Sequence, residues 1–158
     1  MDRFRFLKME RPEIYEFICN SEEKSKEDSN TTLIKLAQIA ELITKYILKE
    51  NHIETNTELL DEINLLKDCH NLNSDIVDLF YKIIIVSNKA IYENYSDSII
   101  AKSFLDKMFE ILVWFAIEYG KRDYRKVDLS NMMPKDKDIF NKYIKSKSYN
   151  DTEKNIEN

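Results

Sequence analysis

The densest group of side chains that could bind an anion lies between residues 121 and 126. Lysine and arginine bind phosphate groups, and a tyrosine among them can stack on a nucleic-acid base. The same charges have a structural interpretation, because cations just past a helix C-terminus complement the helix dipole. Both interpretations are open for this candidate phosphate contact, which comprises Lys121, Arg122, Tyr124, Arg125 and Lys126.

Residues for nucleophilic or metal chemistry are few and far apart. Neither of the two histidines, His52 and His70, has a serine or cysteine partner nearby in the sequence, so we interpret both as solvent-exposed. Cys19 and Cys69 do not form the short ligand spacing of a zinc site with them. We expect no catalytic residue, no metal and no cofactor. With no secretory signal or membrane span predicted, we expect a cytoplasmic protein with reduced thiols.

The composition argues against several classes of site. A single glycine, Gly120, cannot supply a P-loop or a dinucleotide fingerprint, so we expect no nucleotide-driven motor in these 158 residues. The net charge of −5 argues against non-specific DNA binding through a generally basic surface. The 29 acidic residues include no Glu-x-x-His pair. We interpret them, Asp61 and Glu62 included, as solvated helix surface.

Apolar periodicity predicts an all-α fold, a bundle of four to five main helices with an appended C-terminal helix. The polar run 21–30 is interpreted as a frayed helix end and loop. The second helix runs to about Glu50, and the fifth ends at Gly120. The expected helix starts are Pro12, Asn30 or Thr31, Thr55 with Glu58 as a capping box, Asn73 or Ser74, Ser96 or Asp97, and Pro134.

Two apolar segments could be buried either in the core or against a partner. The patch Ile83–Val86 suits a helical core and equally suits a homodimer interface. The second half of the fifth helix, ILVWFAIEYG, is apolar nearly all round, as in a central helix or one covered by another chain. The polar tail 148–158 is predicted to be disordered.

Three segments together resemble a known family of helical domains. They are FRFLKMERPEIYEF at 4–17, NTTLIKLAQIAELITKYIL at 30–48, and DLFYKIIIVSNKAIYENYSD at 78–97 followed by WFAIEYG. Their order and spacing resemble the helical N-terminal domain of type I restriction endonuclease R subunits and related helicases, a family of unknown function in the HEPN group. The resemblance covers residues 4–120 and implies an HEPN-like helical bundle.

The third segment also departs from the family. The family pattern reads approximately Arg-x-x-Gly-Asn-x-Ala-x-His-Glu. Three residues of it are kept, Asn88, Ala90 and Glu93, and three are replaced, by Ile84, Ser87 and Tyr92 for arginine, glycine and histidine. In ribonuclease members of the group that arginine and histidine cleave RNA. Tyrosine moves a proton poorly near neutral pH, and isoleucine cannot hold a phosphate. The resemblance therefore argues against ribonuclease activity here.

A candidate interaction site, or remnant of the motif site, follows from the same segment. It comprises Asn88, Lys89, Tyr92, Glu93 and Tyr95. Asn88 has two interpretations, as a buried polar residue that fixes helix packing or as part of a remnant nucleic-acid site. Tyr92 and Tyr95 are interpreted as candidates for a surface contact or as buried, hydrogen-bonded tyrosines.

These observations predict an HEPN-like domain over residues 1–120, a basic loop and amphipathic helix over 121–147, and the tail. The expected function is that of a non-catalytic accessory domain of a restriction-modification or helicase-type defence system, docking on partner subunits or on nucleic acid. Self-association as a homodimer is a further hypothesis. Two alternatives stay open. One is an HEPN-type ribonuclease or toxin–antitoxin component, and the other is a mobile-element protein that interferes with host defence.

Overall fold

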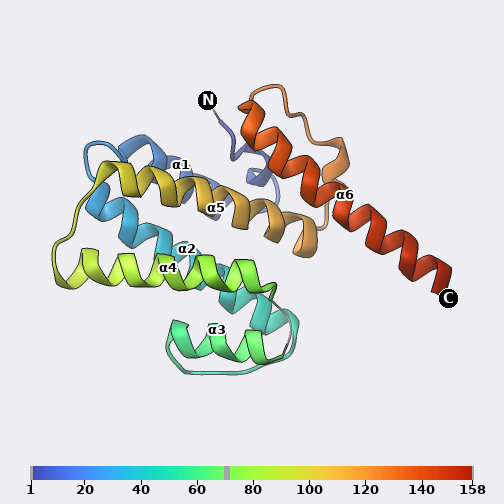
Figure 1. Ribbon diagram of the computed structural model, residues 1–158, viewed down its shortest axis with the longest axis horizontal. Coiled ribbons are helices and arrows are strands. Elements are labelled where there is room, and N and C mark those ends of the chain that lie inside the picture. Colours follow the sequence, from blue (N-terminus) through green and yellow to red (C-terminus); the bar gives the residue numbers. More distant parts are fainter. Residues whose placement is uncertain (1, 70–71, 158) are drawn as a thin grey trace. The chain divides into compact units, whose positions relative to one another are not determined.

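The computed structural model describes residues 2–69 and 72–157, with side chains described up to residue 147 (Figure 1). This part of the chain is helical and contains no strand, which confirms the all-α prediction. The helices are α1 (Pro12–Lys24), α2 (Ser29–Glu50), α3 (Leu59–Asp68), α4 (Ser74–Tyr92), α5 (Ser98–Tyr119) and α6 (Pro134–Glu157), with two short 3-10 helices, η1 (Arg5–Leu7) and η2 (Tyr124–Lys126).

Several helix starts follow the local signals in the sequence. Pro12 and Pro134 each occupy the first position of a helix, where a missing N–H costs nothing. Asn73 caps α4 by accepting the amide of Asp75 at 2.7 Å. Asp97 accepts the amides of two residues in the first turn of α5, at 2.9 and 3.0 Å. These predictions are confirmed.

Two predicted caps are wrong. Helix α2 is capped by Asp28, whose carboxylate accepts the amide of Thr31 at 3.1 Å. The helix begins at Ser29, earlier in the polar run than predicted. Helix α3 begins after Glu58, which makes no side-chain cap. Thr55 instead accepts the amide of Thr57 within the preceding loop. In both places more than one polar residue could serve as the cap.

By their internal contacts the residues form two compact units, one of residues 17–108 and one of residues 1–16 with 109–158. In the first, which we call the central unit, α2 packs on α4, and α3 packs on both (Figure 1). Apolar residues recurring every three or four positions place one face of each helix in the core. The fully buried core of α2 and α4 includes Leu36, Ile39, Ile43, Ile47, Phe80 and Ile83.

The second unit, which we call the terminal unit, is organised around aromatic rings. Phe6 meets the rings of Phe109 and Phe140 edge-on, at centroid distances of 5.9 and 5.6 Å. Phe4 meets Phe109 in the same way at 5.7 Å. Edge-to-face pairs of this kind add to the free energy of burying the rings. The N-terminal segment is thereby fixed to the second half of α5 and to α6.

The predicted division at residue 120 and the predicted tail stay predictions. The backbone of α6 runs to Glu157, and the side chains of residues 148–158 lie outside the described residues. His70 lies outside them as well. No helix in the described ranges combines the length and the apolarity of a membrane span.

Candidate interaction surfaces

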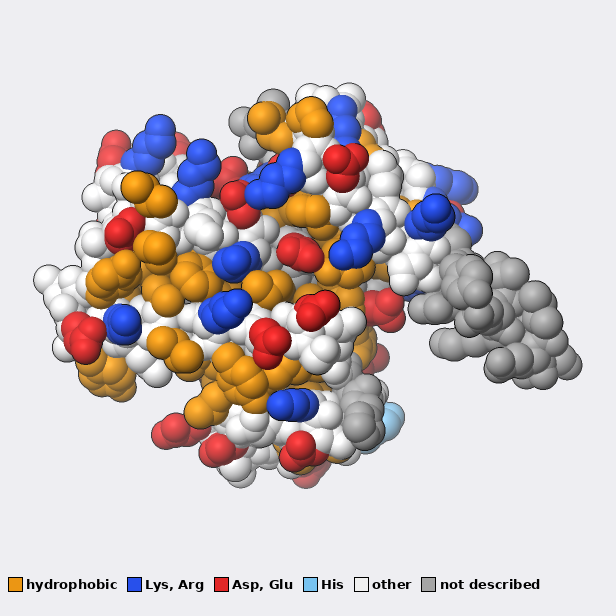
Figure 2. All heavy atoms as spheres, viewed as in Figure 1, with side chains coloured by type: hydrophobic (Ala, Val, Ile, Leu, Met, Phe, Trp, Pro, Cys, Tyr) orange, Lys and Arg blue, Asp and Glu red, His pale blue; other side chains and the backbone are white. Residues whose placement is uncertain are grey.

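An exposed face of α4 carries large apolar side chains about two turns apart. Ile85, Ile91 and Tyr92 are 58%, 52% and 81% exposed. The spacing of three and four residues places Ile85, Asn88 and Tyr92 on one side of the helix, with Ile91 beside them. We call Ile85, Asn88, Ile91 and Tyr92 the α4 face. In Figure 2, hydrophobic side chains gather over α4 and the start of α5.

The structure brings most of the predicted motif residues to this surface. Asn88, Lys89, Tyr92 and Glu93 are exposed, whereas Tyr95 is partly buried. The interpretation of Asn88 as a buried packing residue is wrong, because the preceding residue, Ser87, faces the core and is 2% exposed. Within the patch Ile83–Val86, Ile83 belongs to the core and Ile85 to the surface.

The C-terminal end of α4 is held in place by Asn30 of α2. The Asn30 side-chain amide donates to the carbonyl oxygens of Ala90 and Tyr95, each at 2.8 Å. Between those two residues Asn94 adopts a left-handed conformation, with φ of 53°, which reverses the chain. Asn30 therefore supports the candidate site without belonging to the motif. Its place near a helix start in the sequence suggested only a cap.

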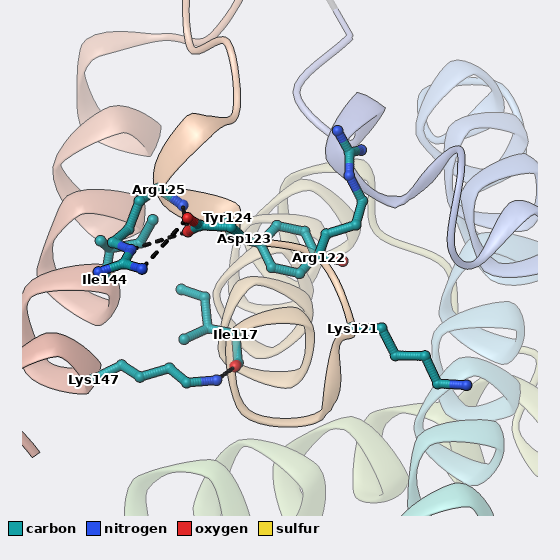
Figure 3. Close-up of a pocket in the computed structure, with 8 residues that line it drawn as sticks. All are labelled: Ile117, Lys121, Arg122, Asp123, Tyr124, Arg125, Ile144 and Lys147. Carbon is teal, nitrogen blue, oxygen red and sulfur yellow. Dashed lines mark hydrogen bonds and ion pairs between the residues drawn. The ribbon is translucent and has the colours of Figure 1, made fainter. Parts of the chain in front are cut away.

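The basic cluster does not act as one group of free charges (Figure 3). Arg125 is paired with Asp123, with Nε 2.9 Å from Oδ1. Lys121 and Arg122 extend away from that pair in different directions. A nearby hollow of about 270 Å³ is also lined by Lys147, which donates to the carbonyl oxygen of Ile117. The pairing of Arg125 reduces the positive charge that this hollow offers to an anion.

Tyr124 is buried beneath this loop, with 5% of its surface exposed. Its hydroxyl donates to Oε2 of Glu10 at 2.5 Å, and Oε1 of Glu10 accepts the amide of Lys121, also at 2.5 Å. Burial, followed by the bond to Glu10, raises the pKa of the Tyr124 hydroxyl, so it stays protonated and acts as a donor. The ring is packed edge-on against Phe6 and is not presented for stacking on a base. A phosphate contact by the remaining basic residues stays a prediction.

One acidic residue was misread from the sequence. Glu62 is 3% exposed, and its Oε2 has no hydrogen-bond partner among the described residues. It borders an open hollow of about 940 Å³ that Lys45, Lys49 and His52 also line. Burial raises the pKa of the Glu62 carboxyl, and the positive charge of Lys45 opposes that shift. Glu62 lies three residues after Leu59 and four before the buried Leu66, on the apolar side of α3. This spacing was a weak signal, which was not used because the residue is charged.

Among the described side chains, no three histidine, cysteine, aspartate or glutamate residues lie together so that they could hold a metal ion. His52 is exposed in a loop, where its φ of 56° places it in the left-handed region. The arrangement offers surfaces and hollows suited to binding.

One comparison with known proteins gives a match at low sequence identity. The chain is similar to the type I restriction enzyme EcoKI endonuclease subunit of Escherichia coli (strain K12), with 29% identity over 115 residues. The match covers 71% of this chain and 10% of that subunit, so the chain spans about a tenth of the length of this relative. No family model matches the chain, and no solved structure matches it. The sequence is thus related to a restriction-enzyme subunit over most of its own length.

Proposed function

We propose that this chain is a non-catalytic interaction domain of a restriction-type defence assembly in the cytoplasm, and that its α4 face docks on a partner subunit. The observation that carries the proposal is the exposure of Ile85, Ile91 and Tyr92 on one side of α4, with Ile91 and Tyr92 about two turns after Ile85. Apolar patches rimmed by polar residues are typical of protein interfaces. Here the rim consists of Lys82, Lys89 and Glu93.

The chemistry of the α4 face suits a protein partner better than a nucleic-acid strand. Tyrosine is over-represented among the residues that dominate binding energy, because its ring buries a large area and its hydroxyl keeps a polar contact. The face itself carries aliphatic side chains, an aromatic ring and an amide but no cation, so it offers little to a run of phosphates. The similarity to a restriction-enzyme subunit supports partners of the same kind.

The absence of catalysis is part of the proposal, as is membership of the HEPN-like group. Ile84, partly buried, and Tyr92, exposed, stand where the resembled family has its arginine and histidine. Neither side chain can replace the cation or the proton carrier. Purified chain incubated with RNA should leave it intact. Cleavage that is lost in Tyr92→Phe or Asn88→Ala would replace this proposal with a ribonuclease.

The docking proposal is tested by affinity capture from the native host, with nuclease treatment, followed by mass spectrometry. We expect restriction or helicase subunits to be recovered. The identified subunit is then titrated against the chain carrying Ile85→Gln with Tyr92→Gln. Loss of a dominant interface residue costs about 2 kcal/mol or more, so affinity should fall by more than about tenfold. The matched control is Met133→Gln, which removes a 53% exposed apolar side chain from the terminal unit.

Two outcomes would overturn the docking proposal. One is capture that disappears on nuclease treatment, which would assign the contact to nucleic acid. The other is equal affinity of the double variant and the control for the captured subunit. Sedimentation of the chain alone tests whether the α4 face binds a second copy of the chain. If the wild type is a dimer and Ile85→Gln with Tyr92→Gln makes it a monomer, the α4 face serves self-association.

A further inference from the structure

A second hollow, of about 520 Å³, lies within the terminal unit and brings together cations from two distant segments. Arg5 and Lys8 line it from η1 and the residue after it, and Arg122 and Lys126 line it from the loop that follows α5. We call it the basic hollow. In a 3-10 helix, residues three apart lie above one another, so Arg5 and Lys8 point to the same side. In Figure 3, Arg122 extends from its loop away from the Asp123–Arg125 pair.

The two segments are fixed to each other by buried contacts. Glu10, two residues after Lys8, accepts from both the Lys121 amide and the Tyr124 hydroxyl. Phe6, 3% exposed, packs edge-on against Tyr124 with ring centroids 6.4 Å apart. The backbones that carry the four cations are therefore held in one arrangement before any ligand binds. Such preorganisation lowers the entropy lost on binding.

The basic hollow carries an excess of positive charge. Among the described residues, none of Arg5, Lys8, Arg122 and Lys126 forms an ion pair. The hollow also contains the carboxylates of Asp2 and Asp128, which oppose part of this charge. The bond from the Ser130 amide lowers the pKa of Asp128 most, and the positive charge of Arg5 adds to that shift. Asp2 accepts the Tyr15 hydroxyl at 2.5 Å, and Asp128 accepts the Ser130 amide at 2.9 Å. Four cations therefore face two carboxylates, in a chain whose net charge is −5.

We propose that the basic hollow binds consecutive phosphate groups of a nucleic-acid strand, through Arg5, Lys8, Arg122 and Lys126. Each guanidinium group can bind one phosphate through two parallel hydrogen bonds. The two lysines add positive charges that attract the neighbouring phosphates of the strand. The volume of the hollow and the number of cations exceed what one phosphate needs. Met9, 79% exposed at the rim, offers a thioether that can contact a base.

The inference goes beyond the proposed docking function and does not depend on it, since the hollow belongs to the terminal unit and the α4 face to the central unit. It also changes the predicted phosphate contact. Arg122 and Lys126 remain in it, and Arg5 and Lys8 join them. Arg125 and Tyr124 leave it, because one is paired with Asp123 and the other is buried.

The test uses the full chain and a fluorescein-labelled single-stranded DNA oligonucleotide, with binding followed by fluorescence anisotropy. With about 0.7 counterions released per phosphate contact on a single strand, four contacts give a slope of log K against log salt of roughly −3. Arg5→Gln with Arg122→Gln should weaken binding by at least about tenfold and bring the slope to roughly −1.4. The matched control is Lys121→Gln with Arg125→Gln, which removes the same charge from outside the hollow and should change affinity by less than about threefold.

Circular dichroism melts serve as the control that both double variants fold. A third variant, Arg5→Lys with Arg122→Lys, keeps the charge and should recover part of the lost affinity. The proposal is overturned by any of three results. They are no binding by the wild type at about 50 mM salt, equal losses in the two double variants, or displacement of the oligonucleotide by polyglutamate as readily as by unlabelled DNA. The variant Ile85→Gln with Tyr92→Gln should bind the oligonucleotide normally, which keeps this test separate from the docking proposal.

Discussion

Glu10 joins the N-terminal segment to the loop after α5, and its substitution gives the sharpest test of the terminal unit. Its carboxylate accepts two hydrogen bonds, from the Lys121 amide and the Tyr124 hydroxyl. Hydrogen bonds to a charged group contribute about 1.5–3 kcal/mol each when buried. The tyrosine bond is partly buried and the amide bond is exposed, so we take the lower end for the first and less for the second. Glu10→Gln keeps the shape but turns an N–H group towards one of the two donors. We expect the free energy of unfolding to fall by about 2 kcal/mol, which lowers the melting temperature by roughly 6 °C for a chain of this length.

The assay is a double-mutant cycle measured by urea unfolding. Tyr124→Phe removes one donor and should cost about 1 kcal/mol. If the two groups interact as described, the effects of Glu10→Gln and Tyr124→Phe are not additive, and the coupling energy is about 1 kcal/mol. Glu16→Gln changes an exposed carboxylate of the same unit and should leave stability within about 0.5 kcal/mol of the wild type. A coupling energy below about 0.3 kcal/mol would refute the reasoning, since it would mean that the two side chains do not meet.

Three further predictions concern single positions. The folded-state pKa of Glu62 is raised by burial, so the stability linked to its proton is fully present below the ordinary carboxyl pKa and is lost as pH rises through the raised value. Glu62→Gln should therefore raise the free energy of unfolding by about 1 kcal/mol at about pH 7 and change it little at about pH 4, measured by urea unfolding; an equal effect at both pH values would contradict the assignment. Gly120→Ala should cost about 2–3 kcal/mol in the same assay, because the added Cβ would lie 2.1 Å from the Ala116 carbonyl oxygen and 2.5 Å from the Tyr124 ring. A neutral result there would show that the end of α5 can shift. Asn30→Ala leaves two carbonyl groups without their donor and should speed hydrogen exchange of the amides between Glu93 and Asp97, with exposed Asn88→Ala as the control that should have no such effect.

Short-range signals in the sequence were sufficient to predict most helices. Proline at the first position and a polar cap set a helix start by chemistry within one turn, so Pro12 and Pro134 were interpreted correctly. Asn73 and Asp97 are the caps observed, each from a pair of predicted candidates. Where several polar residues stand in a row, as before α2, the sequence does not rank them, and Asp28 was missed. The end of α5 before Gly120 was also predicted. The reason differs from a left-handed cap, since this glycine has no positive φ and is needed for the close approach of Tyr124.

The roles of the polar residues were decided by tertiary structure. Asn30 bridges two carbonyl groups some 60 residues away in the chain, Asn88 faces out, and Glu62 faces in. Nothing in the residue types separates these three cases, because a side chain's exposure depends on which elements cover that side of its helix. The same holds for Tyr124, which reads as part of a basic surface motif and is buried against Glu10.

The sequence by itself determined the all-α class, the positions of most helices and the absence of glycine-rich nucleotide motifs, since these depend on local propensity, periodicity and composition. Only the tertiary structure decided which charges remain available for a ligand. Arg125 is neutralised by its neighbour Asp123, whereas Arg5 and Arg122, more than a hundred residues apart, line one hollow. Such a site arises from folding distant segments together, and a linear pattern carries no information on which cations will meet and which will be paired.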